Sequence, residues 1–520
     1  MPSIAPALPP PPEPSIQVSA PRPDSGEAQG APPVPEIEGF LGDMAAAEFR
    51  RLAHLTVDQI ADYLEAVPSL PPLSQVDPGD LAAALPAEAP AHGEPMAEIL
   101  ADVDRMLLPG ITHWAHPRFF AYFTSSGSAA GILGEMLTAG INVNAMLWRT
   151  SPAATELEWV VCRWLARLMG LPDSFDGHIN DTASSSTLVA LAAARENLGR
   201  DIRQHGLAGR PDLLGLRVYA SEQAHSSVEK AVITLGLGRD GYRAVPTDSD
   251  FRMDVSALRR WVDEDRDRGL LPMAVVATVG TTASTSIDPV DGIAEVCSQQ
   301  RLWLHVDAAH GGAMAIVPEW RGVLAGAEHA DSLVVNPHKW LFTPIDCSVL
   351  YTQRPEVLKR AFSVIPEYLA TPERGREAGF GARNLMDFGV SLGRRMRALK
   401  LWFVLRYYGS EGLAIRIRQH VRMAGWLRDQ IEAAPGWEIC APLTMATVCF
   451  RHLPEGLRDE SNLEAHNRAL MAAVNESGAA FISHAVLGGR FVLRASIGSV
   501  RTTPQDVDQL WQALRVAGEP

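Results

Sequence analysis

Lys339 is the residue of this sequence with the most distinctive setting for chemistry. It follows SLVVN (332–336), an apolar run typical of a buried strand, and it comes directly after His338. An exposed lysine at a strand end is the ordinary interpretation of such a position. In an apolar setting, however, loss of hydration lowers the pKa of a lysine, and the neutral amine can then form a Schiff base. Lys339 is therefore a candidate nucleophile.

Asp307 ends a second predicted strand, LWLHV (302–306 and the aspartate itself). A helix cap or a salt-bridge partner would also suit a carboxylate there. Beside a Schiff-base lysine it fits a further role, because pyridoxal phosphate needs an anion next to its ring nitrogen to keep the pyridine protonated. Ala308 and Ala309 follow and are small enough to let a flat ring approach the backbone.

Three further segments hold residues that such a cofactor could use. A run rich in hydroxyl residues, 181–187, precedes a helical pattern, and free N–H groups at a helix start suit a phosphate. Taken alone, the run is better explained as an ordinary Ser/Thr cap. His225 follows the predicted strand LRVYAS (216–221) and could stack on a pyridine ring. Thr278 lies near the end of MAVVATVG (273–280) and could reach the cofactor's phenolic oxygen.

These residues need a sheet to bring them together. The four strand-like runs alternate with helical segments such as 228–235 and 290–300, a pattern that predicts a mostly parallel sheet covered on both faces. Ligands bind at the carboxyl ends of such strands. Further helices are predicted over 44–67, 95–108 and 394–408.

Composition excludes several classes of protein. The 520 residues carry 46 Lys and Arg against 61 Asp and Glu, a net charge of −15, which argues against a nucleic-acid partner. We see no apolar run long enough for a membrane span and no secretory signal. Five scattered cysteines without a CxxC pair predict reduced thiols and a cytoplasmic location. Without an HExxH motif or paired Cys/His spacing, we expect no metal site.

The chain resembles the group II pyridoxal-phosphate-dependent decarboxylases and is closest to aromatic-L-amino-acid decarboxylase. Seven blocks carry the resemblance in order: HPRFFAYF (116–123), SPAATELE (151–158), QAHSSVEKA (223–231), ATVGTT (277–282), HVDAAH (305–310), NPHKW (336–340) and LGRRMRALKLWF (392–403). The resemblance implies the α/β fold of type I pyridoxal-phosphate enzymes, like that of aspartate aminotransferase, and a homodimer with active sites at the subunit interface.

The resemblance also implies a role for each matching position. Lys339 would carry the cofactor, Asp307 would pair with its ring nitrogen, and His225 would stack on its ring and assist catalysis. Ala183, Ser184 and Asn336 would hold the phosphate. Thr278 and Ala309 would line the cofactor, and His338 would lie between phosphate and substrate carboxylate. The residues implied near the substrate are Trp114, Tyr122, Phe123, Ser125, Asn144 and Trp148.

The expected reaction is decarboxylation of an L-amino acid, aromatic in type, with Tyr368 as the acid that protonates Cα. Relatives with Phe at that position tend towards oxidative deamination to an aldehyde. Asn144 and Met146 replace apolar or aromatic residues, and His310 replaces an aromatic one. Because these changes lie near the side-chain pocket, an imidazole or other non-aromatic substrate stays open, as does an inactive scaffold homologue.

The expected domain organisation has four parts. Residues 1–36 hold 12 of the 38 prolines, which predicts a disordered tail. Residues 37–119 would form a helical segment packing on the partner subunit, because it is too small for a core of its own. Residues 120–393 would form the large cofactor-binding α/β domain, and 394–520 a small α+β domain.

Overall fold

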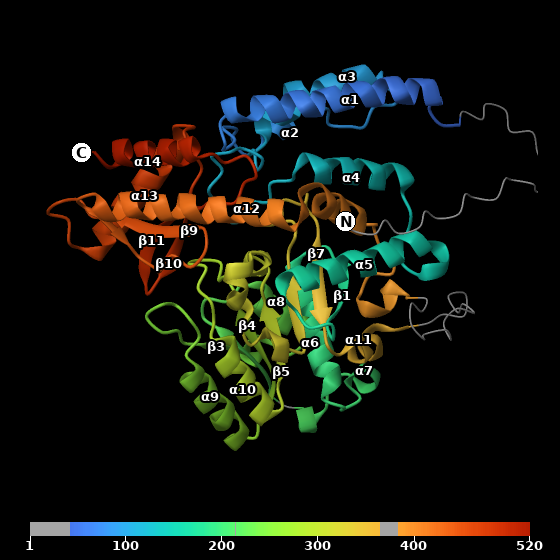
Figure 1. Cartoon of the computed structure of the whole chain (residues 1–520), viewed down its shortest axis with the longest axis vertical. Helices are drawn as coiled ribbons and strands as arrows, with labels where there is room; N and C mark the ends of the chain where they lie inside the picture. The colour runs from blue at the N-terminus through green and yellow to red at the C-terminus, as the bar shows by residue number, and fades with distance from the viewer. Residues whose placement is uncertain (1–41, 214, 365–382, 520) are drawn as a thin grey trace, which may run out of the picture. The chain divides into compact units, whose positions relative to one another are not determined.

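The computed structural model describes residues 42–213, 215–364 and 383–519. At its centre is a seven-stranded sheet in the order β1-β7-β6-β5-β4-β2-β3 (Figure 1). Its strands are β1 (Asp176–Asn180), β2 (Leu216–Ser221), β3 (Tyr242–Val245), β4 (Leu271–Thr278), β5 (Trp303–Asp307), β6 (Ser332–Val335) and β7 (Ser348–Thr352). The five neighbouring strands β6, β5, β4, β2 and β3 are parallel to one another. Strand β7 is antiparallel to both β6 and β1. The expected mostly parallel sheet is confirmed.

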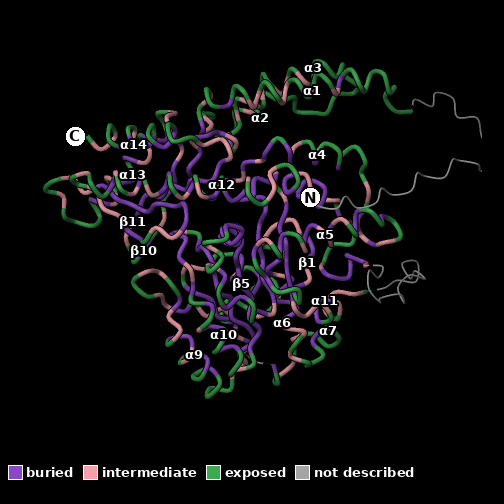
Figure 2. The backbone as a smooth tube through the Cα atoms, viewed as in Figure 1, coloured by how far each residue is buried: buried purple, intermediate pink, exposed green. Residues whose placement is uncertain are grey.

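Both faces of this sheet are buried, as the purple strands at the centre of Figure 2 show. Alternate residues of one strand enter different cores, because successive side chains point to opposite faces. Val275 of β4 packs in the core that contains residues of α5, α9 and α10, whereas Val276 packs with residues of α6, α8 and α11. The near-continuous apolar sequence of these strands follows from this double burial.

The helices between residues 129 and 362 are α4 (Ala129–Ile141), α5 (Pro152–Met169), α6 (Ala183–Asn197), α7 (Ile202–His205), α8 (Ser227–Thr234), α9 (Val255–Asp267), α10 (Val290–Gln300) and α11 (Pro355–Phe362). Caps define where some begin: the side chain of Ser128 accepts from the N–H of Gly131 at α4, and Asp254 caps α9 in the same way. None of the helices in the described ranges has the length and apolarity that a membrane crossing requires.

The N-terminal helices are α1 (Ala46–Ala66), α2 (Asp80–Ala84) and α3 (Met96–Asp102). The helix predicted over 95–108 is α-helical only as far as Asp102. Its pitch then changes through Val103–Leu107 and Leu108–Gly110. The change leads into Pro109, which has no N–H to continue the ladder of hydrogen bonds.

The C-terminal part holds a second, antiparallel sheet in the order β10-β11-β9-β8. Its elements are α12 (Ala398–Ala433), β8 (Trp437–Ile439), β9 (Thr447–His452), α13 (Glu460–Glu476), β10 (Ser483–Leu487), β11 (Arg490–Ser496) and α14 (Pro504–Gly518). The segment around Phe120 lies along this sheet: its N–H donates to the carbonyl of Phe481 at 2.8 Å, and its carbonyl accepts from Ser496 at 2.8 Å. Residues far apart in the sequence are thereby joined.

Candidate active site

Several of the residues singled out in the sequence lie at the carboxyl edge of the parallel strands. Thr278 is the last residue of β4 and Asp307 the last of β5, and the two are register partners. Asn336 comes directly after β6, whose Val334 pairs with Asp307. His225 follows β2 by a turn. Because parallel strands end at the same edge of a sheet, these side chains are gathered there.

Lys339 joins this group through the turn after β6, in which its N–H donates to the carbonyl of Asn336 at 2.9 Å. Its Nζ lies 5.1 Å from the centroid of the Phe123 ring. Burial is the main cause that lowers the pKa of Lys339; Asp307 acts against this shift and Arg494 adds to it. A lowered pKa increases the neutral fraction of the amine, the form that makes a Schiff base.

Asp307 is held with one oxygen fixed by the backbone. Its side chain belongs to a residue that is only 5% exposed, and Oδ1 accepts the N–H of Ala309 at 3.0 Å. A carboxylate fixed in this way at the floor of a site can face a positively charged ring nitrogen.

Two buried polar atoms at the same edge have no hydrogen-bond partner among the described residues: Oγ1 of Thr278 and Oδ1 of Asn336. The backbone around Thr278 is well satisfied, since its N–H donates to Oδ2 of Asp288 at 2.8 Å. A buried polar atom without a partner costs free energy, so these two atoms fit a ligand with polar groups of its own.

The start of α6 offers donors for an anion. The first hydrogen bond of the helix runs from the N–H of Ser186 to the carbonyl of Thr182 at 3.0 Å, and Thr182 makes no side-chain cap. The N–H groups of Ala183 and Ser184 therefore precede the ladder, where helix N–H groups favour a phosphate. Together with Lys339, Asp307, Thr278 and Asn336, they match the phosphate, aldehyde and ring nitrogen of pyridoxal phosphate.

Both histidines of the site accept a backbone hydrogen bond at Nδ1. For His225 the donor is the N–H of Ser227 at 3.2 Å, and for His338 it is the N–H of Cys347 at 2.9 Å. Burial lowers the pKa of His338 to about 4, with the Lys339 cation adding to the effect. Burial also lowers the pKa of His225, although Asp307 opposes the shift.

Aromatic residues lie near Lys339, and Phe123, Tyr122 and Trp114 are called the aromatic wall below. The ring of Phe123, which is 8% exposed, stacks on that of His310 with centroids 3.8 Å apart and planes at 10°. Trp114 and Tyr122 form a second stacked pair at 6.0 Å, and both remain exposed. The partly buried Ser125 follows in the same segment.

The structure ties Asn144 and Trp148 to other residues. Oδ1 of Asn144 accepts the N–H of Arg394 at 2.9 Å, and Nε1 of Trp148 donates to Glu156 at 2.8 Å. These contacts do not bring either residue to Lys339. The remaining residue of the expected set, Tyr368, lies outside the described residues.

Arg494 was not anticipated from the sequence, although a lone arginine in the apolar strand FVLRAS (491–496) was a usable signal. It is 2% exposed, its Nη1 donates to the carbonyl of Tyr122 at 2.6 Å, and its Nε donates to that of Ala283 at 3.0 Å. Its Nη2 has no hydrogen-bond partner among the described residues. A buried cation with one free donor near Lys339 is a ready site for a carboxylate.

Comparison with known proteins decides which family this site belongs to. The profile of the pyridoxal-dependent decarboxylase conserved domain matches residues 78–453. The chain belongs to the pyridoxal-dependent decarboxylases.

Relatives of this decarboxylase match it along nearly their whole length. Tyrosine decarboxylase 3 of Petroselinum crispum is 42% identical, covering 91% of this chain and 92% of the relative. Phenylacetaldehyde synthase of Arabidopsis thaliana is 40% identical, covering 91% and 96%.

The solved structure of Oryza sativa TDC with PLP and tryptamine has a TM-score of 0.88 at 37% identity, covering 92% of this chain and 99% of that one. These matches confirm the expected family, the fold of type I pyridoxal-phosphate enzymes and the cofactor of this decarboxylase.

Proposed function

We propose that this decarboxylase converts an aromatic L-amino acid to its amine and CO2. The observation that carries the proposal is the convergence of the Lys339 amine and the Arg494 guanidinium on the Phe123 ring, at 5.1 and 4.6 Å from its centroid. One residue set thus offers an attachment point, a carboxylate site and an aromatic face. Relatives named tyrosine decarboxylase and tryptophan decarboxylase support the aromatic class.

In this proposal the residues at the strand ends hold the cofactor. Lys339 would hold the aldehyde group, Asp307 would pair with the ring nitrogen, and the hydroxyl of Thr278, which has no partner among the described residues, would donate to the phenolic oxygen. The helix start at Ala183 and Ser184, with Asn336, binds the phosphate, and Ala309 leaves room for the ring. When bound, pyridoxal phosphate supplies an electron-accepting ring for the pair released by the Cα–carboxylate bond.

A second group of residues would hold the substrate. Nη2 of Arg494 donates to the α-carboxylate, with His338 and His225 as further donors. Phe123, Tyr122 and Trp114 contact the side chain, because flat apolar rings favour a flat apolar partner. Ser125 would lie near the polar end of the substrate.

The step after CO2 loss decides the product. Tyr368 donates its phenolic proton to Cα, and the C–H bond that forms completes the amine. If that proton does not arrive, O2 can take the electrons instead, and hydrolysis then gives an aldehyde, ammonia and peroxide. The similarity to phenylacetaldehyde synthases of Arabidopsis thaliana and a rose cultivar supports the aldehyde as an alternative product.

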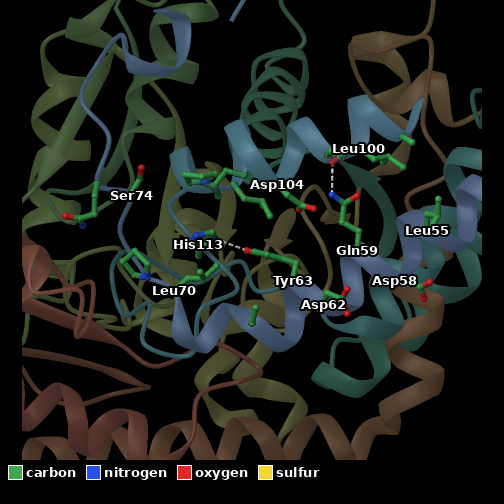
Figure 3. Close-up of a pocket in the computed structure, with 18 residues that line it drawn as sticks. Leu55, Asp58, Gln59, Asp62, Tyr63, Leu70, Ser74, Leu100, Asp104 and His113 are labelled. Atoms are coloured by element: carbon green, nitrogen blue, oxygen red, sulfur yellow. Dashed lines mark hydrogen bonds between the residues drawn. The ribbon is translucent and has the colours of Figure 1, made fainter. Parts of the chain in front are cut away.

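We also propose a homodimer in the cytoplasm. A groove of about 800 Å³ runs along residues 55–66 of α1, with Leu55, Leu70 and Leu100 in its lining (Figure 3). Gln59 bonds the carbonyl of Leu100 at 2.9 Å, and the hydroxyl of Tyr63 meets His113 at 3.0 Å. An apolar groove of this size favours a second copy of the chain as its cover.

Helix α4 supports the same assembly, since Leu133, Leu137 and Ile141 are 53%, 49% and 56% exposed. In the dimer, Asn144 and Trp148 would reach the site of the partner subunit, which accounts for their distance from Lys339 in the contacts of one chain. The five cysteines are all buried and unpaired, which supports the cytoplasmic location.

One assay tests the substrate class: release of amine from each of the twenty amino acids by the cofactor-loaded protein. Turnover of tyrosine, dopa, tryptophan or phenylalanine is expected, and a clear preference for glutamate or aspartate would overturn the proposal. A preference for histidine would move the substrate to the imidazole class. An inactive homologue would show no visible absorbance band on addition of pyridoxal phosphate.

A further inference from the structure

Asp288 is a buried carboxylate beside the proposed cofactor site, and it has no part in the chemistry proposed above. It is 1% exposed and comes directly before Pro289, the residue at which α10 begins. An aspartate at such a place is ordinarily a helix cap. Here the cap position belongs to Pro289, and both oxygens of Asp288 bond to other segments.

The carboxylate of Asp288 accepts two backbone N–H groups. Oδ2 accepts from Thr278 at 2.8 Å, and Oδ1 accepts from Met253 at 2.8 Å. In addition, the N–H of Asp288 donates to the carbonyl of Thr278 at 2.9 Å. One residue therefore holds Thr278 at both its N–H and its carbonyl.

Thr278 needs this support because the sheet ends beside it. Strand β2 pairs with β4 only as far as Val276, whereas on the other side the N–H of Val279 donates to the carbonyl of Asp307 at 2.9 Å. Successive N–H groups of a strand point to opposite neighbours, so the N–H of Thr278 points to the side on which pairing with β2 has ended. A buried N–H requires a partner, and Asp288 supplies it.

A fixed backbone at Thr278 also fixes the direction of its hydroxyl. Threonine is branched at Cβ, so its side chain has few rotamers, and the backbone angles decide which of them is allowed. Oγ1 of Thr278 is buried without a partner among the described residues. A rotation of the peptide at Thr278 would turn this hydroxyl away from a ligand.

We propose that Asp288 is a positioning residue, which holds the backbone of Thr278 so that the hydroxyl of Thr278 faces the phenolic oxygen of the cofactor. The inference rests on the proposed contact between Thr278 and that oxygen. Asp288 itself touches neither cofactor nor substrate in this arrangement. Its whole effect on the cofactor therefore passes through Thr278.

The ionisation of Asp288 indicates that its charge does not serve stability. Burial raises its pKa to about 6, the two N–H groups oppose the shift, and the carboxylate of Asp248 adds to it. Because the folded pKa lies above the unfolded value, the ionised carboxylate disfavours folding, and this cost develops as the pH rises from about 4 to about 6. A neutral variant loses an acceptor for an N–H group but is relieved of this electrostatic cost.

A double-mutant cycle between Asp288 and Thr278 tests the inference. Thr278→Val removes a hydroxyl that has no partner among the described residues and keeps the shape of the side chain. It should weaken binding of pyridoxal phosphate by roughly 3- to 10-fold, the effect of one hydrogen bond. Asp288→Asn should weaken binding by a similar factor. The double variant should lose no more than Thr278→Val alone, because residues that act through one contact are not additive.

The measurement is the dissociation constant of pyridoxal phosphate, from absorbance titration of the cofactor-free protein. Additive losses in the double variant would show that Asp288 acts independently of Thr278 and would overturn the inference. Binding by Asp288→Asn that equals the parent would do the same. Asp291→Asn, at an exposed position of α10, is the matched control and should bind the cofactor as the parent does.

The same titration separates this inference from the proposed function. If Thr278→Val binds the cofactor as the parent does, the proposed contact of Thr278 is wrong, and the role of Asp288 falls with it. If Thr278→Val weakens binding and Asp288→Asn does not, only the role of Asp288 falls. The substrate assay is independent of both results, because cofactor binding does not depend on which amino acid is turned over.

A measurement on the unmutated holoenzyme does not depend on how the variants fold. In protein labelled with [¹⁵N]threonine, the amide signal of Thr278, identified by difference from Thr278→Val, should move with a midpoint near the pKa of Asp288, about 6. The amide of Thr281, which donates to the carbonyl of Ser286 at 3.0 Å, is the internal control and should move less. A Thr278 signal that stays in place between about pH 8 and about pH 5 would overturn the inference.

Discussion

The guanidinium carbon of Arg494 lies 4.6 Å from the centroid of the Phe123 ring. This places a buried cation from β11 against the aromatic wall, although the two residues are far apart in the sequence. The ring stabilises the cation by its quadrupole, and the free Nη2 remains available to a ligand.

Replacing Arg494 should therefore weaken substrate binding more than it slows chemistry. Arg494→Met removes the charge-assisted hydrogen bond to the α-carboxylate, and KM should rise about 10- to 100-fold. Steady-state kinetics with the preferred amino acid measures this change. Arg490→Met is the matched control on the same strand; Arg490 is exposed and pairs with Glu438, so its loss should leave KM within about twofold.

Lys339→Ala should remove the covalent attachment of the cofactor while the chain stays folded. Borohydride reduction followed by peptide mapping should place the pyridoxyl group on Lys339 in the parent and nowhere in the variant. Lys230→Ala serves as the control, because Lys230 lies on the exposed side of α8. A label on Lys230 or Lys400 would refute the assignment.

Tyr368→Phe keeps the ring and removes only the acidic proton. CO2 release should persist, while aldehyde and ammonia replace much of the amine, because loss of a general acid slows its step by about 10²- to 10⁴-fold. The ratio of amine to aldehyde, followed together with O2 uptake, is the measurement. Normal amine production without O2 uptake would show that the proton comes from another group.

The protein should lose stability in mild acid. Burial lowers the pKa of His305 and of His420 to about 4, so the unfolded chain binds protons that the folded chain resists. The free energy of unfolding should therefore fall as the pH drops below the unfolded value near 6.5. The decrease reaches on the order of 3 kcal/mol for each histidine by pH 4.

Urea unfolding at neutral pH and in mild acid measures this loss of stability. In His420→Gln the dependence should be shallower, whereas His92→Gln, at an exposed position, should match the parent. The same steepness in all three proteins would contradict the expectation.

The proposed dimer should depend on the apolar face of α4. Leu137→Glu puts a charge at a position that is 49% exposed in one chain, and sedimentation should show a shift towards monomer. Val486→Glu, on β10 and 58% exposed, should leave the assembly unchanged. A Leu137→Glu protein that sediments as the parent does would remove α4 from the interface.

Local sequence pattern predicted the elements that carry the cofactor site. The run LRVYAS coincides with β2, the helix predicted over 290–300 coincides with α10, and the predicted strands around Asp307 and Lys339 lie within two residues of β5 and β6. Their signal is strong because these strands are buried on both faces, so apolar residues follow one another without a break. The strands β1, β3 and β7 were not predicted. DGHIN (176–180), which forms β1, is short and polar, and no feature of it indicates an antiparallel edge strand.

The contacts that complete the site could not be predicted, because they join distant segments. Arg494 donates to the carbonyl of Tyr122, more than 350 residues away in the sequence. Its proposed role in binding a carboxylate depends on this contact, which the sequence around Arg494 does not reveal. The local pattern around His225 does not show that its ring lies against the N–H of Ser227. For Asn144 and Trp148, the contacts within one chain do not lead to Lys339, and a position near the substrate depends on the proposed second subunit.

Tyr122 is attached to one sheet, and the residues proposed to hold the cofactor are attached to the other. The N–H of Tyr122 donates to Ser483 of β10 at 3.2 Å, and Phe120 is bonded on both sides within the small sheet, whereas Asp307 and Thr278 end strands of the large one. If Tyr122 and Phe123 contact the substrate as proposed, a substitution on the small sheet would change the choice of amino acid and leave the strand ends of the large sheet as they are.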